Sequence, residues 1–355
     1  MNTLRFVIIS LAMFLLPMSC VPQNGEDVGD DPVVEQPSDD DEKPEDKEEE
    51  IPEQPSDDGV WETAAEAVAN MGVGWNLGNT LDSWDPGKGR EGDWLFWETY
   101  WGQSRTTPEL LQMMKNAGFG AVRVPVTWGI HMDADNNVVR AWMDRVHEIV
   151  DYVLDAGLYC IINVHHDTGA DEELAWLVAS PEGYAAEKTR FEGLWKQIAL
   201  RFKDYDQRLL FESFNEMLDK NRSWCFASYN AGYDAELSAG AYKAINDYAQ
   251  SFVDVVRSTG GNNAVRNLVV NTYGACNGGG DWNHHLQDPL KEMKMPSDKV
   301  EDHILFQVHS YPQIDDLGAM EREMGKMLDD LEKNMEGYSG AVKRVIKEGE
   351  KGALR

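Results

Sequence analysis

The chain has 355 residues and a formal net charge of −31. This length suffices for one large domain with appendages, and the negative charge argues against binding to nucleic acid or to an anionic membrane surface. The composition changes sharply along the chain, so we predict three regions, which are residues 1–20, 21–58 and 59–355.

The first region contains an apolar run from Phe6 to Leu16 that follows Arg5. About a dozen apolar residues are too few to span a bilayer and are typical of the core of a signal peptide. The run ends at Pro17-Met18-Ser19-Cys20, which resembles a bacterial lipoprotein processing site with Cys20 as the lipidated N-terminus. An ordinary cleaved signal peptide is the alternative.

The second region, residues 21–58, is rich in Asp, Glu and Pro and has few large apolar residues. Such a segment cannot bury enough surface to offset the entropy of ordering, so we predict an extended, disordered linker. A lipidated Cys20 followed by an acidic linker resembles the surface-exported lipoproteins of Gram-negative bacteria, and this resemblance implies a secreted or cell-surface protein anchored in the outer membrane.

In the third region, short continuous apolar runs alternate with amphipathic helical patterns. The predicted strands are Met71–Trp75, Ala121–Val126, Tyr159–Val164, Leu209–Phe214, Leu268–Tyr273 and Ile304–Val308. The predicted helices are Thr107–Ala117, Ala141–Ala156, Tyr184–Tyr205, Ala235–Thr259 and roughly Leu317–Gly349. This alternation predicts a parallel sheet, either an open doubly wound sheet or a (β/α)8 barrel.

Polar residues at the ends of the predicted strands favour the barrel. An open dinucleotide-binding sheet would carry a Gly-rich turn and a helix start after its first strand. Here the first strand runs into Gly74–Asn79 with no helix start behind it. The polar groups instead follow several strands, as in barrel enzymes: Arg123, His165-His166-Asp167, Asn215-Glu216, Asn271-Thr272-Tyr273 and His309-Ser310-Tyr311.

Glu216 ends one of the most apolar of these segments. A carboxyl group at the mouth of a barrel is partly removed from water, which favours its protonated form. A protonated carboxyl group can donate to a leaving glycosidic oxygen, and Asn215 beside it can bind a neighbouring sugar hydroxyl. Taken alone, an Asn-Glu pair is equally compatible with an idle surface glutamate.

Five sequence segments, taken together and in this order along the chain, make the functional prediction specific. They are Gly74–Asp82, Val122–Trp128, Ile161–Asp167, Phe214–Glu216 and Val308–Tyr311. From about residue 60 to residue 311 the chain resembles glycoside hydrolase family 5, most closely its endo-β-1,4-glucanases. The resemblance implies a (β/α)8 TIM barrel and a retaining endo-β-1,4-glycanase that acts on plant cell-wall β-glucan such as cellulose, xyloglucan or mixed-linkage glucan.

The resemblance also implies roles for individual residues. Glu216 takes the acid/base position, and Asn215 the position that holds the substrate 2-hydroxyl. Arg123 takes the position of the arginine that pairs with the nucleophile carboxylate, although a structural ion pair would need the same residue types. The remaining implied site residues are His165, His309 and Tyr311 beside the reacting bond, and Asn76 and His166 in substrate binding.

Tryptophans can stack on the apolar faces of β-linked sugars. Trp128 and Trp282 fall at a strand end and in a loop after a strand, so we predict that they contact substrate. Trp142 and Trp195 lie inside helical patterns and are predicted to fill the core.

No cofactor is implied, and a monomer is expected. A metal site at His165-His166-Asp167 is an alternative, but adjacent residues of a strand point in opposite directions and cannot easily share one ion. Cys160 is predicted to be a buried thiol, and a disulfide between Cys225 and Cys276 is an open alternative.

A retaining glycosidase needs a second carboxylate about 5 Å from the first. We recognise no segment of the family's nucleophile type after Tyr311, so about six of eight β/α units are expected and the chain alone is expected to be unstable or inactive. The alternatives are a non-catalytic surface glycan-binding protein or inactive fragment, a β-mannanase, and a metal-dependent barrel hydrolase.

Overall fold

A computed structural model describes residues 6–11, 61–85, 94–223, 234–276 and 288–310 of the chain. Within these ranges, no helix is long and apolar enough to cross a membrane. The predicted helix after Leu317 lies outside the described residues.

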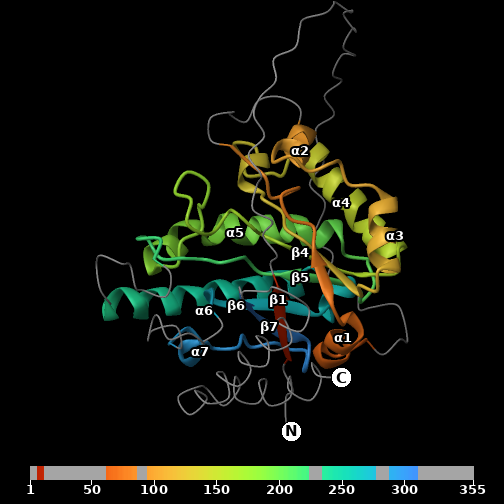
Figure 1. Cartoon of the computed structure of the whole chain (residues 1–355). Helices are drawn as coiled ribbons and strands as arrows, with labels where there is room; N and C mark the ends of the chain where they lie inside the picture. Colours follow the sequence, from red (N-terminus) through yellow and green to blue (C-terminus); the bar gives the residue numbers. More distant parts are fainter. Residues whose placement is uncertain (1–5, 12–60, 86–93, 224–233, 277–287, 311–355) are drawn as a thin grey trace, which may run out of the picture.

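The strands form one seven-stranded sheet in the order β1-β7-β6-β5-β4-β3-β2, in which all neighbours are parallel. Figure 1 shows the sheet curling, as in part of a barrel. The strands are β1 (Phe6–Leu11), β2 (Gly74–Asn76), β3 (Ala121–Val124), β4 (Tyr159–Asn163), β5 (Leu209–Glu212), β6 (Leu268–Cys276) and β7 (Ile304–Ser310). The six strands β2 to β7 confirm the predicted strands, and the (β/α)8 TIM-barrel prediction is confirmed as far as the described part extends.

Helices follow the strands in turn. They are α1 (Ala64–Met71), α2 (Trp97–Tyr100), α3 (Pro108–Asn116), α4 (Arg140–Asp155), α5 (Pro181–Arg201), α6 (Ala235–Ser258) and α7 (Asp288–Glu292). Pro108 and Pro181 each open a helix at a position where a backbone N–H is not needed. The helices α3, α4, α5 and α6 agree with four of the predicted helices to within a few residues.

Two hydrophobic clusters separate the two faces of the sheet. The larger contains alternate strand residues such as Val122, Ile162 and Phe211 together with the buried faces of α4, α5 and α6, so it lies between sheet and helices. The smaller contains the strand residues in between, and these face the interior of the barrel: Ala121, Tyr159, Ile161, Leu210, Val269 and Leu305.

Helix α1 covers the lower end of the barrel interior. Its Ala64, Ala67 and Met71 belong to the smaller cluster. A Cβ atom on Gly120 would lie 2.0 Å from the carbonyl oxygen of Met71, so the close approach of α1 to the start of β3 requires glycine there. Met71 therefore ends a helix, whereas the sequence pattern placed it in the first strand.

A polar layer lies one pleat above this apolar layer, because inward-facing residues recur every second position along a strand. Its members continue the inward-facing series of five strands and are buried: Arg123, Asn163, Glu212, Asn271 and Gln307. This layer forms the floor of the open end of the barrel.

The apolar run near the N-terminus forms β1, which pairs with β7 from Phe6 opposite Leu305 to Leu11 opposite Ser310. An extended apolar segment can pair with the free edge of a parallel sheet through its backbone. The signal peptide remains a prediction from the sequence.

The cysteine and tryptophan predictions for the core are confirmed. Cys160 is a free, buried thiol, and Trp142 and Trp195 are fully buried. Cys276 is disulfide-bonded. Cys225, the partner considered from the sequence, lies outside the described residues.

Candidate active site

Glu216 lies just after β5 at the open end of the barrel, and β7 brings His309 beside it. The Nδ1 atom of His309 is 2.6 Å from Oε1 of Glu216, and the two side chains are 8% and 15% exposed. The Nε2 atom of His309 lies 2.8 Å from the amide nitrogen of the buried Gln307. The structure therefore places a partly exposed carboxyl group within hydrogen-bonding distance of an imidazole.

Beneath Glu216, Arg123 makes a two-pronged ion pair with Glu212. Its Nε and Nη2 atoms donate to the two carboxylate oxygens, both at 2.6 Å. Burial alone would raise the pKa of Glu212, but the charge and hydrogen bonds of Arg123 outweigh it and hold that pKa below its usual value. Arg123 was predicted to pair with a nucleophile carboxylate, and the carboxylate partner described here is Glu212.

Glu212 is the site residue that sequence reasoning missed. A signal was present, because Glu212 is a charged residue inside the predicted strand Leu209–Phe214. A charge in a strand covered on both faces requires a partner of opposite charge. That partner, Arg123, is 89 residues away along the chain, so its identity depends on the pairing of the strands.

The two site asparagines both reach Arg123. Nη2 of Arg123 donates to Oδ1 of Asn215 at 2.9 Å, and Nη1 donates to Oδ1 of Asn76 at 3.4 Å. Asn215 is 6% exposed. The structure thus brings Asn76, Asn215 and Arg123, predicted from three different segments, into one hydrogen-bonded group.

His165 lies on the same floor and contacts Asn163, the last residue of β4. The amide nitrogen of Asn163 is 3.1 Å from Nδ1 of His165 and 3.1 Å from Oε1 of Glu212. Removal from water lowers the pKa of His165 well below its usual value, and the charges of His166 and Arg123 lower it further. His165 is therefore neutral over the physiological pH range.

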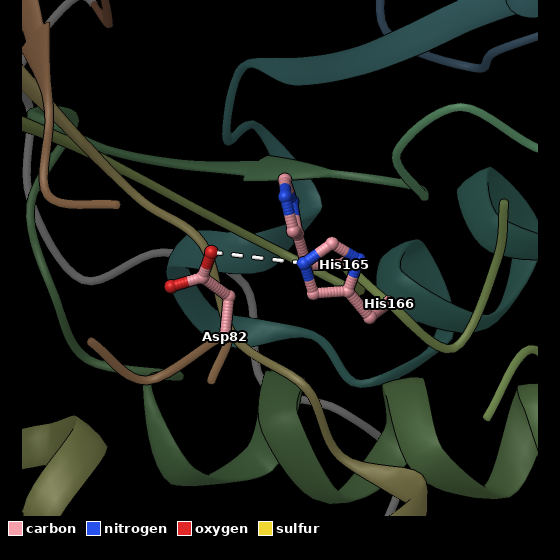
Figure 2. A group of neighbouring side chains, drawn as sticks. All are labelled: Asp82, His165 and His166. Atoms are coloured by element: carbon pink, nitrogen blue, oxygen red, sulfur yellow. Dashed lines mark ion pairs between the residues drawn. The ribbon is translucent and has the colours of Figure 1, made fainter. Parts of the chain in front are cut away.

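Asp82, His165 and His166 point toward one another at the edge of the site (Figure 2), and one ligand atom from each lies within 4.8 Å of the others. The Nε2 atom of His166 is 3.8 Å from Oδ2 of Asp82. Burial raises the pKa of Asp82 above its usual value, although His166 opposes the shift. The two imidazole rings lie 4.6 Å apart because β4 ends at Asn163. The expectation that adjacent histidines diverge is therefore wrong.

A metal ion at this cluster would compete with a hydrogen bond of His165. Nδ1 of His165 lies 3.1 Å from the amide nitrogen of Asn163, so an ion at Nδ1 would displace this contact and an ion at Nε2 would require the ring proton on Nδ1. With His165 engaged by Asn163, two ligands are left. Asp82 and His166 remain, whereas a zinc site uses at least three protein ligands. The cluster fits contact with sugar hydroxyls better than coordination of an ion.

Asp167, which was considered as a third metal ligand, has a different task. Its fully buried carboxylate accepts hydrogen bonds from the backbone N–H groups of Trp128 and Gly129 at 2.8 and 2.6 Å, and from Nε1 of Trp176 at 2.6 Å. It thereby fixes the segment after β3 against the segment after β4.

The structure corrects the predicted sugar contact of Trp128. Its side chain is fully buried, and its Nε1 donates to the carbonyl oxygen of Asn163 at 2.8 Å. A buried indole has no face on which a sugar ring could stack. Its position at a strand end suggested exposure, but the Asp167 carboxylate holds the backbone so that the indole turns inward.

We expect Asp167→Asn to lower the free energy of unfolding by about 1–3 kcal/mol, because an amide nitrogen would face an N–H donor in a buried site. Urea unfolding followed by tryptophan fluorescence measures this loss. Asp133→Asn is the matched control, since Asp133 accepts backbone N–H groups in an exposed turn. An equal shift of both midpoints would contradict the assigned role of Asp167.

Several predicted residues lie outside the described part of the chain. These are Tyr311 and Trp282 of the predicted site, and Cys20 at the predicted processing site. Their roles remain predictions.

The chain is similar to known proteins over most of its length. The family model for cellulase, glycosyl hydrolase family 5, matches residues 87–349. Endoglucanase B of Ruminococcus albus is 36% identical over 253 residues, which are 70% of this chain and 54% of the relative. Endoglucanase B of Neocallimastix patriciarum is 36% identical over 259 residues, which are 70% of this chain and 48% of the relative. The chain thus spans about half the length of these curated relatives.

The chain is also similar to proteins of solved structure. A broad-specificity endoglucanase from an uncultured bacterium is 54% identical with a TM-score of 0.72, and the match covers 78% of this chain and 75% of that chain. A glycoside hydrolase family 5 enzyme from Prevotella bryantii, solved with a xyloglucan tetradecasaccharide, is 44% identical with a TM-score of 0.67. That match covers 78% of this chain and 76% of the other chain.

Proposed function

Since this chain belongs to glycoside hydrolase family 5, the cellulase family, we propose that it acts as an endo-β-1,4-glucanase on plant cell-wall β-glucans and retains the anomeric configuration. The observation that carries the proposal is the contact of 2.6 Å between Glu216 and His309 above the Arg123–Glu212 pair. Glu216 acts as the general acid that protonates the leaving glycosidic oxygen, and then as the general base for water.

The floor of the site supports this chemistry. Arg123 is held by the ionised Glu212, and its Nη2 atom also donates to Asn215, which stands beside the acid. A retaining mechanism requires a second carboxylate as well as the acid, and among the described residues the carboxylate partner of Arg123 is Glu212.

Xyloglucan is the first substrate to test, because the similar Prevotella bryantii enzyme was solved with a xyloglucan tetradecasaccharide. The other candidate substrates are cellulose and mixed-linkage glucan, with mannan as the β-mannanase alternative. We further propose, from the sequence pattern alone, that Cys20 anchors the protein at the surface of a Gram-negative cell.

Release of reducing ends from xyloglucan, mixed-linkage β-glucan, carboxymethylcellulose and mannan tests the proposal. In a form of the protein that carries the second carboxylate, which every activity assay proposed for it requires, we expect turnover on the β-1,4-glucans, a rapid fall in viscosity, and a first product with retained configuration by proton NMR. Turnover confined to mannan would favour the β-mannanase alternative, and an inverted product would exclude the retaining mechanism. Tight glycan binding without turnover would favour the second candidate function, a non-catalytic glycan-binding protein.

A further inference from the structure

We propose that the buried carboxylate of Glu212 fixes the direction of the hydrogen bonds at the site, so that the surrounding side chains present N–H donors to the bound glycan. Glu212 is then a positioning residue, which acts through Asn163, Arg123 and their neighbours. The catalytic consequence rests on the proposed function, whereas the hydrogen-bond directions can be measured without turnover.

Glu212 is fully buried and ionised. It accepts from Nε and Nη2 of Arg123, both at 2.6 Å, and from the amide nitrogen of Asn163 at 3.1 Å. The amide nitrogen of Asn271 approaches Oε1 at 3.4 Å. An ionised carboxylate is an acceptor with no donor of its own, so each of these neighbours must turn an N–H toward it.

The orientation of Asn163 follows from this constraint. Its amide nitrogen faces the Glu212 carboxylate, and its Oδ1 accepts the backbone N–H of Val126 at 3.2 Å. A flipped amide would place oxygen against carboxylate and nitrogen against an N–H group, and would lose both bonds. The orientation is therefore fixed from both sides.

Asn163 in turn selects the tautomer of His165. The same amide nitrogen donates to Nδ1 of His165 at 3.1 Å. Because the lowered pKa keeps His165 neutral, the ring proton is on Nε2, and this nitrogen is a donor. Glu212 thus influences the protonated nitrogen of His165 indirectly, by orienting the amide of Asn163.

Glu212 orients Asn215 through Arg123. Nη2 of Arg123, held by Glu212, donates to Oδ1 of Asn215 at 2.9 Å. Arginine has no acceptor, so the oxygen of Asn215 must face it and the amide nitrogen is left for the substrate. His165 and Asn215 therefore both present N–H groups, which suits the hydroxyl oxygens of a β-linked glucan as acceptors.

The direct test is the 15N chemical shift of the His165 ring in the unmodified chain, assigned by its disappearance in His165→Gln. We expect Nδ1 to be unprotonated and Nε2 to be protonated between about pH 6 and pH 8, in keeping with the lowered pKa. A proton on Nδ1 would overturn the proposal, whether or not the chain has any activity.

Glu212→Gln is the matching variant, because its amide nitrogen would face Arg123 or Asn163. We expect the Nδ1 proton to become populated in His165, and kcat on β-glucan to fall about 100-fold, as for a misplaced catalytic array. An unchanged tautomer in folded Glu212→Gln protein would refute the role. Should this variant fail to fold, a proton on Nδ1 of His165 in the unmodified chain would still refute the proposal.

Glu98→Gln is the control for the loss of a buried ion pair. Glu98 is fully buried, and it accepts from Nε and Nη2 of Arg145 at 2.9 and 2.7 Å and from the backbone N–H of Thr106, rather than from residues bound to Glu212. We expect it to lose stability without any change in the His165 tautomer, and to keep kcat within about twofold. If Glu212→Gln and Glu98→Gln changed the His165 tautomer equally, the effect would come from general loss of stability and the proposed role of Glu212 would be refuted.

Discussion

Replacing Glu216 by glutamine is expected to lower kcat on β-glucan by about 10²–10⁴-fold, because the variant cannot donate a proton to the leaving oxygen. The side chain keeps its shape and most of its burial, so the thermal midpoint should change little. Initial rates on xyloglucan and carboxymethylcellulose, with thermal unfolding in parallel, measure the two quantities.

A substrate whose leaving group needs no protonation separates loss of the general acid from other causes of inactivity. A dinitrophenyl cellobioside departs without protonation, so its first step should be much less impaired in Glu216→Gln, and added azide should restore turnover because it needs no general base. Glu236→Gln, an exposed change in the first turn of α6, is the control and should leave kcat unaltered. Equal losses on the polysaccharide and the activated glycoside would contradict the acid/base role.

The second large effect is expected on stability, at Arg266. This residue precedes β6 and is fully buried. Its five N–H groups all donate at 2.7 to 3.1 Å, to Oδ1 of Asn263 and to the carbonyl oxygens of Asp206, Leu209, Phe202 and Tyr205. Its guanidinium carbon also lies 4.9 Å from the centre of the Phe211 ring. One side chain thus joins the end of α5, the start of β5 and the approach to β6.

We expect Arg266→Met to lower the free energy of unfolding by about 3–5 kcal/mol, because several buried carbonyl groups would lose their donors at once. Arg266→Lys should lose nearly as much, since an ammonium group has three donors and cannot span the same acceptors. Urea unfolding by circular dichroism measures both variants.

Arg208→Met is the matched control. Arg208 pairs with Asp206 near the same loop, but both side chains are substantially exposed. A surface pair of this kind contributes less than about 1 kcal/mol. If the Arg266 and Arg208 variants were equally stable, the five buried hydrogen bonds would not be the source of the effect.

Much of the fold could be predicted from local patterns. All six predicted strands exist, and five of them and four helices lie where the sequence places them to within a few residues, because continuous apolar runs and amphipathic periodicity reflect burial directly. The first strand was misplaced by a few residues, since Met71 is equally apolar in a helix end and in a strand. The pattern could not distinguish the two without the contact between α1 and Gly120.

Residues at strand ends could be predicted to lie together. Glu216, Asn215, Arg123, His165 and His309 were all named for that position, and the structure brings them close to one another, while their roles stay predictions. Trp128 was misjudged by the same rule, because its exposure depends on the buried Asp167 carboxylate. Glu212 was missed because its function depends on a partner from another strand.

The sequence by itself determined that strands and helices alternate and that polar groups gather at the strand ends. These properties are local, since each depends on residues within a few positions. The tertiary structure decided that Glu212 neutralises Arg123, that Asn163 sets the proton of His165, and that Trp128 belongs to the core. These depend on strand register and side-chain direction, which bring distant residues within hydrogen-bonding distance and which no local pattern encodes.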